Sequence, residues 1–135
     1  MTLDELEVGR AAERTRTVTP ADIAAFAEVS GDRNPVHLDE AFAAGTPFKG
    51  VIAHGMLSAA WISAMLAGEL PGPGSVYLSQ SLSFRRPVRP GDEVVTRVEV
   101  TAIDREKGRV TLATTASVAG KTVVEGEAVV LAPRA

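Results

Sequence analysis

Gly55-Met56-Leu57-Ser58-Ala59-Ala60-Trp61-Ile62-Ser63-Ala64-Met65-Leu66-Ala67 is the stretch of this 135-residue chain that decides its fold. Wound into a helix, these residues leave almost no polar face, and a helix that is apolar all round is predicted to be buried on all sides. The two serines can satisfy themselves by donating to the backbone carbonyl four residues earlier. The run is well short of the roughly 20 residues that a membrane span needs, so we expect a core helix.

Beyond this helix the apolar period changes to two, which indicates β-strands. Within residues 76–84, valine, leucine and phenylalanine share one predicted face, and Gln80 falls on that same face, where it would need a buried hydrogen-bond partner. Further strands are predicted at residues 94–102, 109–119 and 122–132, with short turns between them. This pattern is typical of an antiparallel meander.

One apolar helix and one curved antiparallel sheet have a simple packing solution, in which the sheet wraps the helix. The predicted class is therefore α+β with a hot-dog arrangement, in a single domain over residues 1–135. The open back and the edge strands of such a sheet favour dimerisation.

The N-terminal part of the chain predicts a polar edge strand at residues 10–18 and then a helix. Thr19 is the expected N-cap of this helix, with Pro20 at its first position and Gly31 as its C-terminal stop. Asp39 is expected to cap a second, short helix that Gly45 closes.

Composition excludes several classes of function. The chain has 14 basic and 17 acidic residues, so a nucleic-acid binder or a general membrane-surface binder is not expected. It has no cysteine and only two histidines, which argues against disulfides, thiolate chemistry and a zinc site. Residues 1–7 are acidic and lack the pattern of a secretory signal, so we expect a cytoplasmic protein.

The candidate chemistry lies in Ser30-Gly31-Asp32-Arg33-Asn34-Pro35-Val36-His37-Leu38-Asp39. Glycine and proline prevent this segment from being one continuous helix, so a bent loop can aim Asp32 and His37 at one point. A carboxylate and an imidazole can together hold a water, take its proton and return a proton to a neighbouring atom. The simpler alternative is that the aspartate caps a turn and the histidine hydrogen-bonds the core.

Gly55 is the second candidate, because N–H groups at a helix N-terminus are unpaired and favour negative charge. Its amide could hold an oxyanion, although a glycine there could simply permit a tight turn. His54 could be catalytic, but capping or packing is the favoured interpretation. Ser63 could border a cavity, with a back-bonded hydroxyl as the default.

Other side chains are candidates for contacts with a substrate. Arg85, Arg86 and Arg89 could meet phosphates of a carrier, although such clusters are usually solvated. Trp61, Met65 and Leu66 are candidates for the floor of an acyl pocket.

The segment 30–39 resembles the SGDxNPxHxD motif of the MaoC-like, or hydratase 2, family. The likeness continues through Val51-Ile52-Ala53-His54-Gly55-Met56-Leu57, residues 76–84 and Arg89-Pro90-Gly91-Asp92-Glu93-Val94, and so covers nearly the whole chain. Among family members the chain is most similar to the short bacterial (R)-specific enoyl-CoA hydratases that supply polyhydroxyalkanoate synthesis.

The resemblance implies a homodimer of hot-dog folds that adds water reversibly and syn to a trans-2-enoyl-CoA, giving the (R)-3-hydroxyacyl product. Asp32 and His37 become the catalytic pair, the Gly55 N–H the donor to the thioester carbonyl, and Ser63 a residue near the site. No metal and no cofactor are expected, since coenzyme A is part of the substrate.

Three alternatives accompany this interpretation. The same chemistry could serve as a 3-hydroxyacyl dehydratase on acyl-carrier-protein thioesters. A hot-dog thioesterase is disfavoured because the Asp–His motif is of the hydratase type. A non-enzymatic acyl-thioester-binding or partner-stabilising subunit is disfavoured by the intact Asp32 and His37. The residues leave open which of the two takes the first proton.

Overall fold

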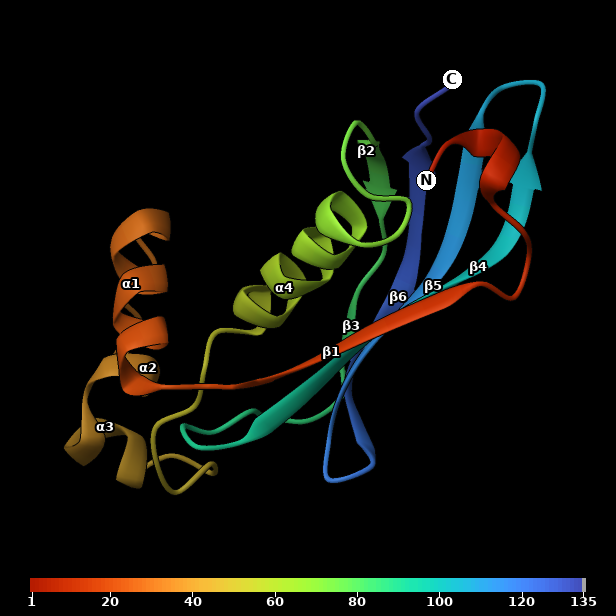
Figure 1. Cartoon of the computed structure of the whole chain (residues 1–135). Helices are drawn as coiled ribbons and strands as arrows, with labels where there is room; N and C mark the ends of the chain where they lie inside the picture. The colour runs from red at the N-terminus through yellow and green to blue at the C-terminus, as the bar shows by residue number, and fades with distance from the viewer. Residues whose placement is uncertain (135) are drawn as a thin grey trace.

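The computed structural model describes residues 1–134. In it, one antiparallel six-stranded sheet has the order β1-β4-β5-β6-β2, with β3 paired to β6 (Figure 1). The strands are β1 (Ala11–Thr17), β2 (Val76–Gln80), β3 (Ser83–Phe84), β4 (Glu93–Asp104), β5 (Arg109–Val118) and β6 (Lys121–Leu131). The helices are the 3-10 helix η1 (Leu3–Glu5) and the α-helices α1 (Pro20–Ser30), α2 (Pro35–Leu38), α3 (Glu40–Ala44) and α4 (Gly55–Gly68).

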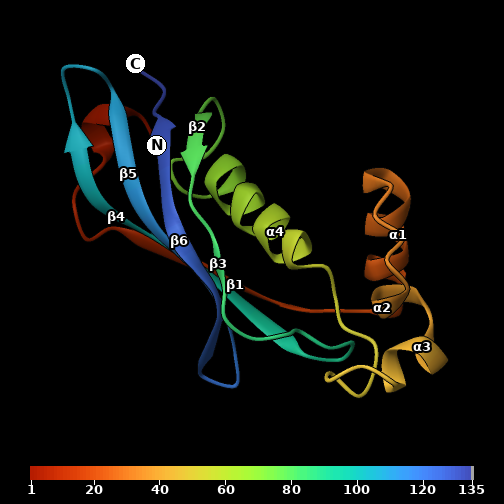
Figure 2. The same ribbon diagram turned by 180° about the vertical axis from the view of Figure 1, so that it is seen from behind.

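Helix α4 packs along one face of the twisted sheet, in contact with β1, β4, β5 and β6 (Figures 1 and 2). Ile62, Met65 and Leu66 of this helix are fully buried there. The buried side chains they meet across the core include Val94, Val98, Val100, Val110, Leu112, Ala116, Val124, Ala128 and Val130. The predicted α+β class, with an apolar helix against a single antiparallel sheet, is confirmed. Within residues 1–134 no helix is long and apolar enough to cross a membrane.

The prediction that α4 is buried on all sides is wrong for this chain. Its outward positions Met56, Ala60 and Ala64 are exposed, and Met56 keeps 53% of its surface. The physical reason is geometric, because one sheet covers one side of a helix and the remaining helices do not close the other. An apolar surface is therefore left next to the sheet edge.

Helix α1 begins and ends where the sequence predicts. The Thr19 hydroxyl accepts the Asp22 N–H at 3.1 Å, the Asp22 carboxylate accepts the Thr19 N–H at 3.1 Å, and Gly31 closes the helix at φ +76°. Burial alone would raise the pKa of Asp22, but the hydrogen bonds from Thr19 and Arg16 outweigh it and lower that pKa. Asp39 likewise caps α3 by accepting the Phe42 N–H at 3.1 Å. The predicted polar edge strand is β1, at one end of the sheet order.

Strand β4 follows the predicted alternation up to Val100, with Val94, Thr96 and Val98 pointing into the core. A bulge between Val100 and Ala102 then shifts the pairing with β5, and Ala102 is exposed although the alternation predicted it inside. A bulge adds one residue to one strand and so reverses the faces beyond it.

The segment 76–84 departs most from its predicted pattern. The pairing of β2 with β6 is irregular between Tyr77 and Ser79, and β3 is a separate pair of residues. Val76, Leu78 and Phe84 are exposed, so they form no buried face in this chain. The predicted partner of Gln80 exists: its Nε2 donates to Oγ1 of the fully buried Thr114 at 2.9 Å.

The break between β2 and β3 requires Gly126 of β6. A Cβ at this position would lie 1.8 Å from the backbone oxygen of Ser81, which is far inside contact distance. We expect Gly126→Ala to lower the free energy of unfolding by about 2 kcal/mol or more, because the two backbones must separate. Urea denaturation measures this.

Gly68→Ala is the matched control, since a Cβ there meets nothing within 4 Å. It should leave stability unchanged or raise it by up to about 1 kcal/mol. Equal stability of the two variants would contradict this account of the break.

Candidate active site

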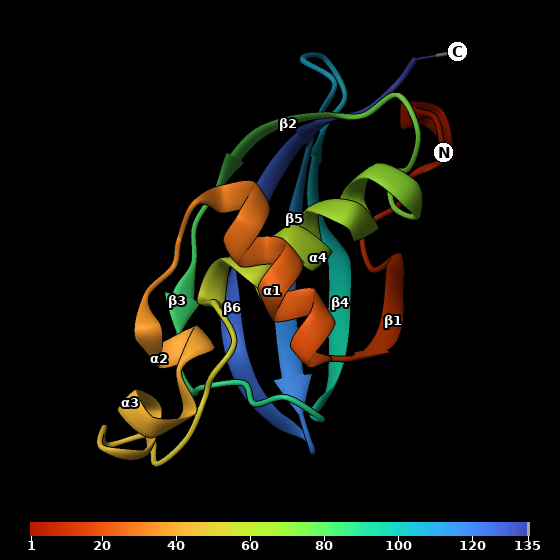
Figure 3. The ribbon, with the colours of Figure 1, turned by 90° about the vertical axis from the view of Figure 1, so that its left-hand side faces the viewer.

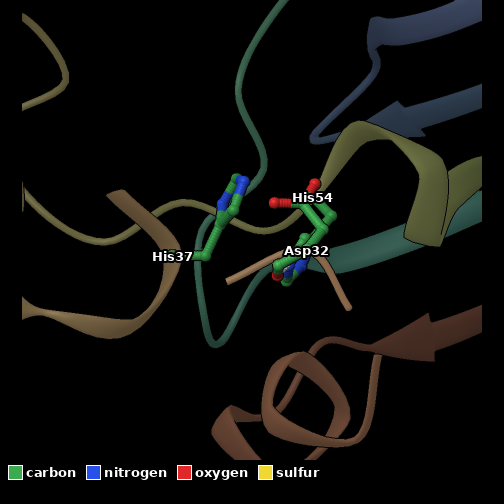
Figure 4. Close-up of side chains that lie close together, drawn as sticks. All are labelled: Asp32, His37 and His54. Atoms are coloured by element: carbon green, nitrogen blue, oxygen red, sulfur yellow. Dashed lines mark hydrogen bonds between the residues drawn. The ribbon is translucent and has the colours of Figure 1, made fainter. Parts of the chain in front are cut away.

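Asp32, His37, His54 and Gly55 line one cavity of about 450 Å³ between the α1–α3 region and β3. A carboxylate oxygen of Asp32 and one ring nitrogen of each histidine all lie within 4.8 Å of one another (Figure 4). Figure 3 shows α1 and α2 on the same side of the molecule as the start of α4. The two segments that the sequence singled out therefore meet at one place.

The Asp32 loop is ordered by its own side chains. The Ser30 hydroxyl accepts the Asp32 N–H at 3.1 Å, and Asp32 Oδ1 accepts the Asn34 N–H at 3.2 Å. Asn34 then caps α2, accepting the Val36 N–H at 3.3 Å. His37 thus stands on a one-turn helix, where the sequence predicted a bent loop. Asp32 Oδ2 is the carboxylate oxygen left for chemistry.

His37 is held by the backbone of the segment that leads into α4. Its Nδ1 lies 2.7 Å from the carbonyl oxygen of Ile52, and the Ile52 N–H donates to the Val36 carbonyl at 3.2 Å. A carbonyl can only accept, so Nδ1 carries the proton and Nε2 is the nitrogen through which His37 can exchange a proton.

His54 is buried, with 2% of its surface exposed. Its Nε2 lies 2.9 Å from the backbone carbonyl oxygen of Asp32, and its ring stacks on His37 with 3.9 Å between centroids. It makes no side-chain cap on α4, although it occupies the N-cap position. Of the two structural alternatives that the sequence left for His54, packing is confirmed and capping is wrong.

Gly55 is the first residue of α4, where backbone N–H groups have no acceptor within the helix. A Cβ on Gly55 would lie 2.6 Å from two ring atoms of Phe84, so the phenylalanine ring packs directly over the glycine. Neither Phe84 nor the Ile52 carbonyl was singled out from the sequence. Every residue has a carbonyl, and Phe84 simply continued a strand pattern, so only the placement of the chain reveals them.

Ser63 does not line the cavity of Asp32 and His37. It borders a second, mostly apolar groove of about 490 Å³ between α4 and β2, and Met56 lines both spaces. The groove is lined by Phe26, Met56, Ala59, Ala60, Ser63, Tyr77, Leu78, Ser79, Gln80 and Leu82. Burial raises the pKa of Tyr77, whose hydroxyl donates to Gln80.

The residues proposed for an acyl-pocket floor lie elsewhere. Met65 and Leu66 are buried in the core against the sheet. Trp61 is covered by the Arg16 guanidinium, 4.7 Å from its ring centroid. None of the three lines the cavity or the groove.

The predicted arginine cluster is divided. Arg85 and Arg86 line the cavity, but Arg85 is paired with Glu125 through two hydrogen bonds of 3.0 and 2.8 Å. Arg89 points to the Phe48 carbonyl instead. Arg86 is therefore the arginine best placed for an anionic ligand.

Asp32, His37 and His54 are the side chains of this site that could be considered as ligands of a metal ion. A histidine ligates in the plane of its ring, whereas the rings of His37 and His54 are stacked with 28° between their planes. This arrangement suits proton transfer to a substrate better than ligation by both histidines.

A family model described as the MaoC like domain matches residues 4–123. The chain belongs to the MaoC-like domain family. It is 50% identical over 134 residues to an (R)-specific enoyl-CoA hydratase from Aeromonas caviae, covering 98% of this chain and 100% of that relative. It is also 50% identical over 131 residues to a 3-hydroxybutyryl-CoA dehydratase from Methylorubrum extorquens, covering 97% and 83%.

Solved structures of similar proteins have the same fold as this chain. The unliganded R-hydratase PhaJ1 from Pseudomonas aeruginosa superimposes with a TM-score of 0.95 at 53% identity, covering 99% of this chain and 86% of that one.

The packing of Phe84 on Gly55 generates a prediction that separates activity from stability. Gly55→Ala should change the free energy of unfolding by less than about 1 kcal/mol, because alanine suits a helix and Phe84 is partly exposed and free to rotate. The displaced ring would crowd the backbone N–H, so kcat/KM should fall at least about tenfold. Steady-state kinetics and urea denaturation of the same preparation measure both; an Ala variant with wild-type kcat/KM would contradict it.

Proposed function

We propose that this chain catalyses the reversible (R)-specific hydration of trans-2-enoyl-CoA to (R)-3-hydroxyacyl-CoA. The observation that carries the proposal is that Asp32, His37 and Gly55 line one cavity, while backbone groups occupy Asp32 Oδ1 and His37 Nδ1 and leave Oδ2 and Nε2 without such partners. The identity to a curated (R)-specific enoyl-CoA hydratase over nearly the full chain supports it.

In this proposal one water lies between Asp32 Oδ2 and His37 Nε2. A poor nucleophile such as water needs a positioned base, and one of these two groups takes its proton. The oxygen forms a bond to Cβ of the enoyl group, and the double-bond electrons move to the thioester carbonyl as an enolate. A proton returned from the pair to Cα completes the addition, so the elements of one water are added.

The Gly55 N–H would stabilise the enolate oxygen, since it stands at the start of α4 where the helix dipole favours negative charge. Addition of both hydrogen and hydroxyl to one face follows from a single Asp–His pair serving both steps. His37 can take part only through Nε2, because the Ile52 carbonyl holds its Nδ1–H.

The same proposal assigns the acyl chain to the groove between α4 and β2, which meets the cavity at Met56. Its apolar lining suits an alkyl group, and the Ser63 hydroxyl would border the acyl chain about two helical turns beyond Met56. The coenzyme A part of the bound substrate would then extend out of the cavity past Arg86, whose positive charge suits its phosphates. The absence of a further cofactor and a cytoplasmic location both stay predictions.

Asp32→Ala and His37→Ala should each lower the rate of hydration by at least about 10²-fold, the lower range for loss of a general acid or base. Loss of the conjugated enoyl-thioester absorbance measures the rate, and chiral analysis of the product should give the (R) isomer. Glu106→Gln, in the β4–β5 turn, is the control and should keep the wild-type rate.

An (S) product, or undiminished rates in both alanine variants, would contradict the mechanism. Matched CoA and acyl-carrier-protein substrates in the same assay separate the hydratase from the carrier-protein dehydratase. Release of free thiol would indicate a thioesterase, and unchanged absorbance a binding subunit without activity.

We further propose that the protein is a homodimer that pairs through β2. The two edges of the sheet differ: β1 carries Glu13, Arg14 and Arg16, charges that discourage strand addition. Edge strand β2 instead exposes Val76, Tyr77 and Leu78. It lies beside the uncovered apolar side of α4, and a second copy related by a two-fold axis would cover both.

Light scattering after size exclusion should give twice the 14.1 kDa chain mass. Leu78→Glu should yield monomers at micromolar concentration, because it places a charge opposite its own copy in an apolar interface. Val8→Glu alters another exposed apolar residue outside this surface, and it should leave the dimer intact. A dimeric Leu78→Glu protein would rule out this interface.

A further inference from the structure

His54 is in contact with both members of the Asp–His pair. Its ring lies between Phe26, with 4.9 Å between centroids, and His37, with 3.9 Å. Its Nε2 faces the Asp32 carbonyl at 2.9 Å, across 22 positions of sequence. No other side chain of the described residues touches both Asp32 and His37 in the hydrogen bonds and ring contacts of the structure.

The surroundings of His54 select one tautomer. The Asp32 carbonyl can only accept, so Nε2 must carry a proton. Nδ1 is buried and has no hydrogen-bond partner, and a proton there would be a buried donor without an acceptor. His54 is thus set to be a neutral Nε2–H imidazole, the opposite tautomer to that of His37.

The hydrogen bond of His54 joins two parts of the site that are otherwise separate in the chain. Asp32 lies in the exposed loop between α1 and α2, where its other bonds are local, to Ser30 and Asn34. His54 directly precedes Gly55, the first residue of α4. The bond therefore fixes the carboxylate-bearing loop to the helix start that carries the oxyanion donor.

The ring stack restrains His37 perpendicular to its ring plane, on the side that His54 covers. The Ile52 carbonyl restrains the His37 ring within its own plane through Nδ1. His54 covers one face of that ring, so Nε2 can turn neither in the plane nor toward that face.

We propose that His54 is a positioning residue that sets the distance between Asp32 and His37 mainly through its Nε2–H bond to the Asp32 carbonyl, with its stack on the His37 ring as the lesser contact. It exchanges no proton with substrate. The kinetic part of this inference rests on the proposed hydratase function, and the hydrogen bond itself does not.

Two substitutions separate the contacts. His54→Phe keeps an aromatic ring against His37 but removes the donor, and we expect kcat to fall between about 10-fold and 10²-fold because the carboxylate loop is released. His54→Gln places an amide N–H₂ near the former Nε2, and kcat should stay within about fivefold of wild type. KM should stay within about threefold in both variants, since neither removes a contact to substrate.

Thermal melting of the two variants accompanies the kinetics. A purely structural role would lower kcat only as far as the folded fraction falls, and it would not distinguish glutamine from phenylalanine. Wild-type kcat in His54→Phe, or a His54→Gln protein as impaired as His54→Phe while both are folded, would overturn the proposal.

The tautomers of the two histidines in the wild-type protein offer a second test, independent of kinetics. The chain has only two histidines, so a ¹H–¹⁵N correlation spectrum of the imidazoles at mildly alkaline pH contains two ring systems. We expect one Nε2–H tautomer, His54, and one Nδ1–H tautomer, His37, with the first absent in His54→Gln.

An Nδ1–H tautomer at His54 would overturn the proposal directly. Wild-type protein without hydratase activity would instead contradict the proposed function, and the spectrum would still decide the hydrogen bond.

Discussion

Burial of one face of α4 against the sheet is the interaction on which the rest of this structure depends. Burial of each of the Ile62, Met65 and Leu66 side chains stabilises the folded state by about 1.5–3 kcal/mol. Each buried valine side chain of β4, β5 and β6 contributes a similar amount. The ion pairs of the described residues are partly or fully exposed, so solvent screens them and they add little to the stability of the fold. Hydrophobic packing therefore decides where α4 lies, and with it where Gly55 stands.

The candidate site is assembled from the fixed start of α4 outward. Three contacts of the segment 52–54 tie the α1–α2 region to it: the Ile52 N–H to the Val36 carbonyl, His37 to the Ile52 carbonyl, and His54 to the Asp32 carbonyl. Each joins a side chain or N–H to a backbone oxygen, so the exposed loop carrying Asp32 inherits the rigidity of the core. This is how an irregular segment can hold a carboxylate and an imidazole in a defined geometry.

The apolar surface of the chain is concentrated at one edge of the sheet, and this has a consequence for the proposed function. Edge strand β1 is protected by charge, whereas β2 and the outward side of α4 are apolar and border the groove that contains Ser63. The groove meets the Asp32 cavity at Met56. A partner that covers this surface would therefore also close the space proposed for the acyl chain, so assembly and substrate binding would share one surface.

The sequence by itself determined what local chemistry decides. It placed the caps Thr19 and Asp39, the stop at Gly31, the period of β4, and the Asp32–His37 pair beside an apolar helix, because each depends on neighbours within a few residues. Only the tertiary structure decided the bulge at Ala102, the one-sided burial of α4, the assignment of Ser63 to a separate groove, and the bonds to the carbonyls of Ile52 and Asp32. The reason is physical: a backbone carbonyl is chemically alike at every position, so its partner depends on which distant segment the packed core brings against it.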